Sequence, residues 1–150
     1  MFWLLQAVVL VGDDPASKVY VGRKNRYSYM MLSDPTLPVN RDFADTLAVR
    51  VSNAWYRFDH QTGKVNTFSP GPDSGLSEMC FVPRRKDAPE GDGYLVGVCS
   101  RNKENRSDLL IVDAQHLEDG PVATVKLPYR ATPQVHGFWV GGYELPTAKG

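Results

Sequence analysis

Short runs of β-branched and aromatic residues, separated by turn residues, follow one another along most of the chain, and helix periodicity is almost absent. Runs of this kind between glycine, proline, asparagine and aspartate residues are typical of strands. The candidate strands are Arg26–Met31, Leu47–Val51, Trp55–Asp59, Lys64–Ser69, Cys80–Pro83, Tyr94–Ser100, Leu109–Asp113, Ala123–Leu127 and Gly137–Val140. We therefore predict an all-β fold, and short antiparallel strands at this spacing suit a sandwich, a barrel or propeller blades.

Two polar loops predict hairpins between neighbouring strands. His60–Gly63 ends in glycine, which supplies the positive φ that such short loops require. Arg101–Ser107 separates two further candidate strands in the same way. The apolar residues of Leu109–Val112 do not alternate with polar ones, and this predicts a strand that is covered on both faces.

An apolar run at the N-terminus, Phe2–Val11, is interrupted only by Gln6. It is too short to span a membrane, which takes about 20 apolar residues. It also lacks the basic segment and the small-residue cleavage site of a signal peptide. Two alternatives stay open: a buried strand, or a start created by truncation of a longer reading frame.

Composition and charge narrow the classes of partner. With 42% hydrophobic and 23% charged residues among 150, the chain can bury a core. Seventeen basic residues balance seventeen acidic ones, so we expect no nucleic-acid partner, and the charge does not indicate contact with an anionic membrane. The short basic stretch Arg84–Lys86 is followed by Asp87 and Glu90, which indicates a solvated loop.

The two cysteines, Cys80 and Cys99, both lie in apolar, strand-like surroundings. Neither belongs to a C-x-x-C pair, which excludes a zinc ribbon and a thioredoxin-like motif. A free cysteine in such surroundings usually acts as a small buried hydrophobic residue. We therefore expect free thiols and a reducing, cytoplasmic location.

From about Val21 onward, a series of motifs resembles the carotenoid oxygenase family, which includes the lignostilbene dioxygenases. The motifs are Val21–Arg23 with Tyr27–Tyr29, Phe58–Lys64, Ser77–Arg84, Glu90–Leu95, Ser107–Ala114, Pro121–Ala123, Leu127–Pro128 and the histidine–glycine pair His136–Gly137. Their number, order and spacing make the resemblance specific. It implies that residues 18–150 are the C-terminal part of a propeller domain, and that residues 1–17 are an apolar segment that does not match the family.

Three positions depart from the family pattern. Met79 replaces a proline after the glutamate, and Gly91 replaces an acidic residue in the loop before Tyr94. We expect both to affect local backbone rigidity more than chemistry. Upstream of Val21, the family's glutamate-containing segment has no counterpart that aligns.

The resemblance also implies a fold and a metal site. The fold would be the last blades of a seven-bladed β-propeller, incomplete in this chain, in which four histidines bind one Fe(II). His136 matches the last of these ligands. Glu78 matches a glutamate that accepts a hydrogen bond from the outer ring nitrogen of an iron-bound histidine, which fixes the tautomer of that ring. His60 and His116 fall on turn positions that do not bind metal, and we expect both at the surface.

The activity that the resemblance implies is cleavage of a conjugated double bond by O2 into two carbonyl products. The substrate would be a small hydrophobic molecule, an apocarotenoid or a stilbene. The family's other three histidine ligands precede the region covered here, so we expect the isolated chain to be inactive. The alternative is a truncated remnant without catalysis, or a β-rich interaction module. Phe138 and Trp139 would line a substrate tunnel or, more often for such aromatics, belong to the propeller core.

Overall fold

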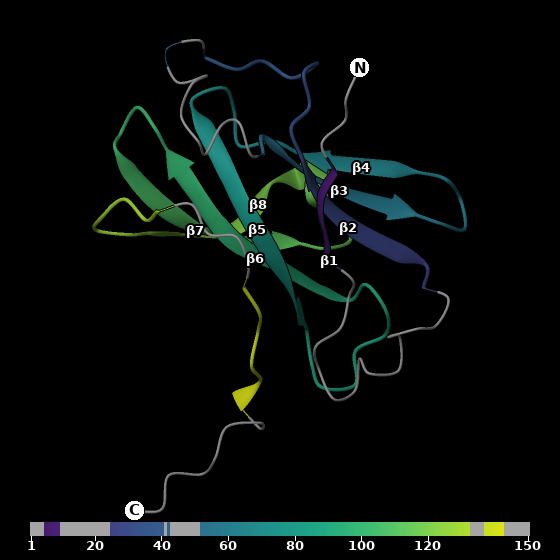
Figure 1. The fold of residues 1–150 in the computed structure, drawn as a ribbon. Helices are drawn as coiled ribbons and strands as arrows, with labels where there is room; N and C mark the ends of the chain where they lie inside the picture. The colour runs from purple at the N-terminus through teal and green to yellow at the C-terminus, as the bar shows by residue number, and fades with distance from the viewer. Residues whose placement is uncertain (1–4, 10–24, 41, 43–51, 133–136, 143–150) are drawn as a thin grey trace, which may run out of the picture.

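The computed structural model describes residues 5–9, 25–40, 42, 52–132 and 137–142. It contains two antiparallel four-stranded sheets, each with its strands in chain order, as Figure 1 shows. The first consists of β1 (Leu5–Val9), β2 (Tyr27–Leu32), β3 (Ala54–Asp59) and β4 (Val65–Phe68). The second consists of β5 (Ser74–Pro83), β6 (Gly93–Arg101), β7 (Arg106–Asp113) and β8 (Pro121–Lys126). A short 3-10 helix, η3 (Leu117–Asp119), precedes β8.

Most of the predicted strands are confirmed with shifted ends. Both predicted hairpins are present, because β3 pairs with β4 and β6 pairs with β7. Gly63 adopts a φ of 71°, as its place in the first loop requires. The apolar N-terminal run contains a strand, since Leu5–Val9 pairs with β2. The candidate strand Leu47–Val51 lies outside the described residues.

Two predictions, one about residues 137–140 and one about Leu109–Val112, are wrong. Residues 137–140 are exposed and form no strand, and they belong to neither of the two described sheets. Leu109–Val112 is also not covered on both faces: Leu110 and Val112 are fully buried, whereas Leu109 and Ile111 are only half-buried. The alternation of burial along β7 follows from one face of the strand contributing Leu110 and Val112 to the hydrophobic core while the other face does not.

The hydrophobic core lies between the two sheets. Both sheets contribute, and its buried members are Tyr29, Met31, Trp55, Phe68, Leu76, Met79, Leu95, Cys99, Leu110, Val112, Ala114 and Leu117. The ring of Tyr29 stacks on Phe81 across the sheets with 5.9 Å between centroids. The hydroxyl of Tyr29 donates to the carbonyl oxygen of Ala114 at 3.2 Å, so its side-chain oxygen has a hydrogen-bond partner.

Within the described residues, no helix has the length and apolar character that a membrane-spanning helix needs.

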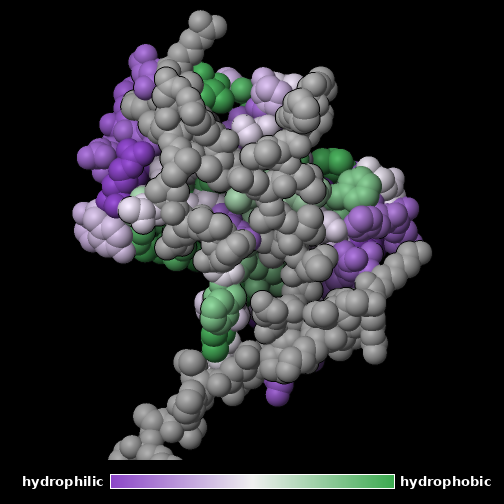
Figure 2. Space-filling view, viewed as in Figure 1, coloured by the Kyte–Doolittle hydropathy of each residue, from purple (hydrophilic) through white to green (hydrophobic). Residues whose placement is uncertain are grey.

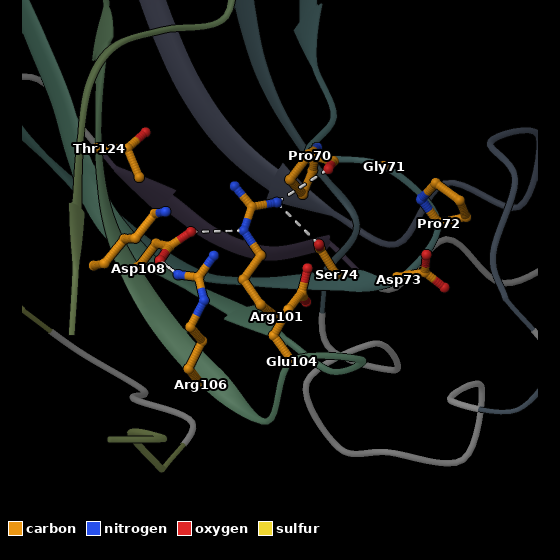
Figure 3. Close-up of a pocket in the computed structure, with 11 residues that line it drawn as sticks. Pro70, Gly71, Pro72, Asp73, Ser74, Arg101, Glu104, Arg106, Asp108 and Thr124 are labelled. Carbon is orange, nitrogen blue, oxygen red and sulfur yellow. Dashed lines mark hydrogen bonds and ion pairs between the residues drawn. The ribbon is translucent and has the colours of Figure 1, made fainter. Parts of the chain in front are cut away.

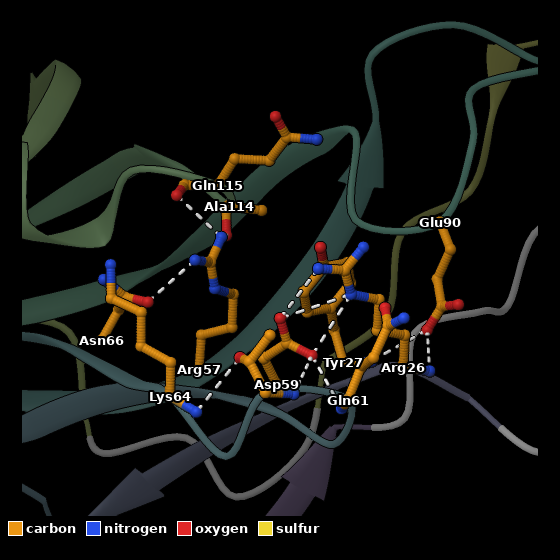
Figure 4. Close-up of polar contacts among 11 residues, drawn as sticks. Arg26, Tyr27, Arg57, Asp59, Gln61, Lys64, Asn66, Glu90, Ala114 and Gln115 are labelled. Atoms are coloured by element: carbon orange, nitrogen blue, oxygen red, sulfur yellow. Dashed lines mark hydrogen bonds and ion pairs between the residues drawn. The ribbon is translucent and has the colours of Figure 1, made fainter.

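Polar contacts tie the sheets together at one end of the core (Figure 4). Glu90, in the loop between β5 and β6, accepts hydrogen bonds from the backbone N–H groups of Arg26 and Tyr27 at 2.7 and 2.9 Å. The Arg26 guanidinium donates to both carboxylate oxygens of Asp59 and holds the pKa of that carboxyl well below its usual range. Arg57 reaches across to the carbonyl oxygen of Gln115 at 2.7 Å.

The glycine that replaces the family's acidic residue has a local structural role. Gly91 adopts a φ of 79°, a conformation that side chains with a Cβ rarely take. A Cβ there would also lie 2.7 Å from the ring of Tyr27. The other departure, Met79, is 1% exposed and fills the core. Gly91 thus has a role in backbone shape and Met79 a role in packing, and their effect on chemistry stays a prediction.

Candidate metal centre

Glu78 lies at an irregularity in β5. Leu76 pairs with Cys99 and Met79 pairs with Gly97, so three steps along β5 match two steps along β6. The extra residue is a β-bulge. In a regular strand, positions three apart would face opposite sides, but the bulge allows Leu76 and Met79 both to be buried. Between them, the side chain of Glu78 is only half-buried and is available to another segment of the chain.

The other segment is the one that follows the predicted iron ligand. The backbone N–H of Gly137 donates to Oε2 of Glu78 at 3.1 Å, across 59 residues of sequence. His136 itself lies outside the described residues, so its ring is not placed here. The sequence singles out His136 and Glu78. The hydrogen bond places Gly137, the neighbour of His136, against Glu78.

Packing beneath Glu78 fixes the backbone of the bulge. The indole N–H of Trp55 donates to the carbonyl oxygen of Ser77 at 3.1 Å, and the Trp55 side chain is fully buried. Gly97 on β6 leaves room for this arrangement, because a Cβ there would lie 2.7 Å from the Trp55 ring and 2.9 Å from the carbonyl oxygen of Glu78. A rigid backbone at the bulge in turn limits where the Glu78 carboxylate can lie.

Cys80 follows Glu78 on the same strand and carries a neutral thiol. Its Sγ donates to the carbonyl oxygen of Val96 at 3.4 Å. Burial raises the pKa of Cys80, and the nearby charge of Glu78 adds to this. A metal ligand or nucleophile would need the thiolate form, which these surroundings disfavour. Cys80 and Cys99 are both free, as the sequence predicts.

The two remaining histidines lie on turns, as expected for surface residues. His60 is exposed, its Nε2 lies 2.8 Å from Oγ of Ser28, and its ring meets Phe58 edge-on. His116 is exposed at the start of η3. In the described part of the chain, no three histidine, cysteine, aspartate or glutamate residues come together in a way that would hold a metal ion.

The aromatic residues after His136 do not belong to the core. Phe138 is 74% exposed and Trp139 is 47% exposed, and the apolar surface of this segment is visible below the sheets in Figure 2. The expectation that they pack in the propeller core is wrong for this chain. The segment that carries the two rings pairs with no described strand.

A cavity of about 360 Å³ lies apart from Glu78, at the end of the second sheet (Figure 3). Its floor holds Asp108, whose side chain is 2% exposed and is paired with Arg101 at 2.8 Å and with Arg106. Arg101 also donates to Oγ of Ser74 at 3.0 Å. The two guanidinium groups compensate the buried negative charge of Asp108, which a buried carboxylate requires. These lining residues therefore have a structural role.

Glu78 was singled out by the sequence motifs, but the groups that support its backbone were not. Neither the bulge nor the support from Trp55 and Gly97 has a local signature, because each depends on residues from another strand or sheet. The one available signal was Gly97, a glycine inside a strand pattern, which often marks the close approach of another group.

The chain is similar to known proteins along most of its length. Residues 16–141 match the family described as retinal pigment epithelial membrane protein. Lignostilbene-alpha,beta-dioxygenase isozyme III of Sphingomonas paucimobilis is 37% identical over 131 residues, which are 86% of this chain and 26% of that enzyme. Isoeugenol monooxygenase of Pseudomonas nitroreducens is 43% identical over 117 residues, 77% of this chain and 24% of that enzyme.

Solved structures give the same result. The crystal structure of Pseudomonas brassicacearum lignostilbene dioxygenase matches with a TM-score of 0.74 and 31% identity, over 82% of this chain and 25% of that one. The chain thus spans about a quarter of the length of the relatives it matches. By the extent of the family match and the agreement in fold, the chain belongs to the RPE65/carotenoid oxygenase family.

Proposed function

We propose that this chain is the C-terminal portion of a non-haem Fe(II) dioxygenase that cleaves a conjugated C=C bond with O2 and releases two carbonyl products. Its family consists of oxygenases that use a metal. In this proposal His136 is one of four histidine ligands, and Glu78 accepts a hydrogen bond from the outer ring nitrogen of an iron-bound histidine. The other three ligands belong to parts of a longer protein beyond this segment.

One observation carries the assignment of the site. The hydrogen bond from Gly137 N–H to Glu78 Oε2 ties the residue after His136 to a carboxylate on β5. A carboxylate held this way, on a strand whose backbone is fixed by Trp55, suits the task of orienting an imidazole. The chain's other histidines are engaged or exposed on turns and support no competing ligand.

The donor chemistry fits ferrous iron. A neutral imidazole is a suitable ligand for Fe(II), and histidines alone leave the metal its full charge. When bound, the iron supplies the capacity to bind and activate O2. The part of Glu78 is to hold one ring nitrogen protonated, which leaves the opposite nitrogen free to bind metal and makes it more basic. The neutral thiol of Cys80 does not compete for the ion.

The proposed substrate class is an apocarotenoid or a hydroxystilbene. The names of two relatives support the second choice, since both are lignostilbene dioxygenases. We also propose a reducing, cytoplasmic location, supported by two free cysteines whose pKa is raised by burial.

The alternative is an inactive remnant or a β-rich interaction module. Both proposals are compatible with the finding that the described residues contain no group of three metal-binding side chains. Under both proposals the isolated chain should bind Fe(II) weakly, below one ion per chain, and should not cleave a stilbene or an apocarotenal. Anaerobic iron titration followed by a turnover assay measures this. Tight stoichiometric iron with turnover would contradict the expectation that one histidine ligand is insufficient.

A chimeric protein distinguishes the dioxygenase proposal from the proposal of an inactive remnant. Residues 16–141 replace the matching segment of the Sphingomonas paucimobilis dioxygenase, which then supplies the remaining ligands. A chimera with one iron and measurable cleavage of a lignostilbene supports the enzyme proposal. A chimera that folds, with the relative's melting behaviour, but takes up no iron supports the remnant.

Within the chimera, Glu78→Gln is expected to lower iron affinity or cleavage rate about 10–100-fold. Glutamine keeps the size and one acceptor oxygen but loses the charge that polarises the histidine ring. Iron affinity and kcat/KM are measured together with the melting temperature. Glu90→Gln is the matched control, because Glu90 bonds only to backbone N–H groups in the hydrogen bonds described for it. Equal loss of iron in the two variants would refute a specific role for Glu78.

A further inference from the structure

The strand β1 belongs to the first sheet although it lies before the part of the chain that matches the family. It pairs with β2 as the first strand of the first sheet, with a shift of register between Gln6 and Val8, and it also contacts β5 of the second sheet. Yet the match to the family begins at residue 16, after β1 has ended at Val9. A segment outside the matched region therefore completes a sheet that is otherwise built from matched residues.

The two sheets have the same plan, which shows what position β1 fills. Each is a four-stranded meander with antiparallel neighbours in chain order. In the second sheet, the position next to β6 is held by β5, a strand of the matched region. In the first sheet, the equivalent position next to β2 is held by β1.

The residues of β2 at this position are core residues. Gln6 lies opposite Met31 and Val9 opposite Tyr29. Met31 is 4% exposed and Tyr29 is fully buried. Both side chains belong to the hydrophobic core, and the edge of β2 that faces away from β3 carries backbone N–H and C=O groups with which a further strand can pair.

We propose that the edge of β2 is a strand-accepting site for an extended apolar peptide, and that Leu5–Val9 fills it from within the chain. Addition of a strand to a sheet edge draws affinity from backbone hydrogen bonds and tolerates different side chains. That tolerance explains how a segment outside the family match can occupy the site. The sequence Leu-Gln-Ala-Val-Val is apolar and has no proline or glycine, as such a strand requires. The inference concerns this edge alone and is independent of iron.

Amide hydrogen exchange on the intact chain tests the site at single residues. Successive amides of a strand point to opposite neighbours, so alternate amides in Tyr29–Leu32 point to β1 and the others to β3. In the unaltered chain both sets should be protected. In Val8→Pro, the amides that point to β1 should exchange at least about tenfold faster, while those that point to β3 keep their protection. Val8→Thr, which keeps a β-branched residue, should behave like the parent.

A peptide supplied in solution then tests whether the edge accepts a strand. A synthetic peptide of residues 1–12 with two added terminal lysines should restore protection of the same alternate amides in Val8→Pro. The same peptide carrying proline at position 8 should not. Two results would overturn the proposal: loop-like exchange of both sets in the unaltered chain, or protection in Val8→Pro that equals the parent's. If Val8→Pro unfolds, the exchange rates of the unaltered chain still test the pairing. They show directly whether the amides of β2 that point to β1 are protected.

Discussion

Replacing His136 by alanine in the chimera is expected to remove both bound iron and double-bond cleavage. Alanine supplies no lone pair, so the metal would be left with three imidazoles, and the site would also lose the group that Glu78 is proposed to orient. We expect iron content near zero after desalting and cleavage at background level. Elemental analysis and steady-state rates measure the two effects.

His60→Ala and His116→Ala are the matched controls for this substitution. Both residues are exposed, and His60 makes a side-chain contact only with Ser28 and Phe58 among the contacts described for it. Each variant should keep its iron and most of its activity. Loss of iron in either control, together with its retention in His136→Ala, would show that the assignment of the ligand is wrong.

Trp55→Ala is expected to destabilise the isolated chain by about 3–5 kcal/mol, as removal of a large buried aromatic side chain usually does. Trp55 is fully buried between the sheets, meets Phe68 with 5.7 Å between ring centroids and bonds to Ser77. Such a loss is a large part of the stability of an ordinary domain, about 5–15 kcal/mol. Urea unfolding followed by fluorescence or circular dichroism measures it.

Phe138→Ala is the control, since it removes another aromatic ring from a position that is 74% exposed. A change within about 0.5 kcal/mol is expected for such a surface substitution. Trp55→Phe should fall between the two, because it keeps a ring but loses the bond to Ser77. A cost for Phe138→Ala as large as that for Trp55→Ala would mean that the exposed segment packs in solution.

Strands whose side chains follow a local rule could be predicted from the amino-acid sequence alone. The stretches 27–31, 55–59 and 94–100 alternate or cluster β-branched and aromatic residues, and each became a strand of the structure. The turn at Gly63 was also predictable, because positive φ is a property of the residue itself. The family followed from ordered motifs, and Glu78 and His136 were singled out from those motifs alone.

Tertiary structure decided the features that depend on neighbours distant in sequence. The polar start of β7 joins the sheet because Arg101 and Arg106 neutralise Asp108, and no local pattern encodes that pairing. The bulge beside Glu78 exists because Leu76 and Met79 must both reach the core. Phe138 and Trp139 are exposed, and no described strand pairs with their segment. Strand pairing and burial arise from contacts between segments, so a pattern along one segment predicts a strand but not its partner.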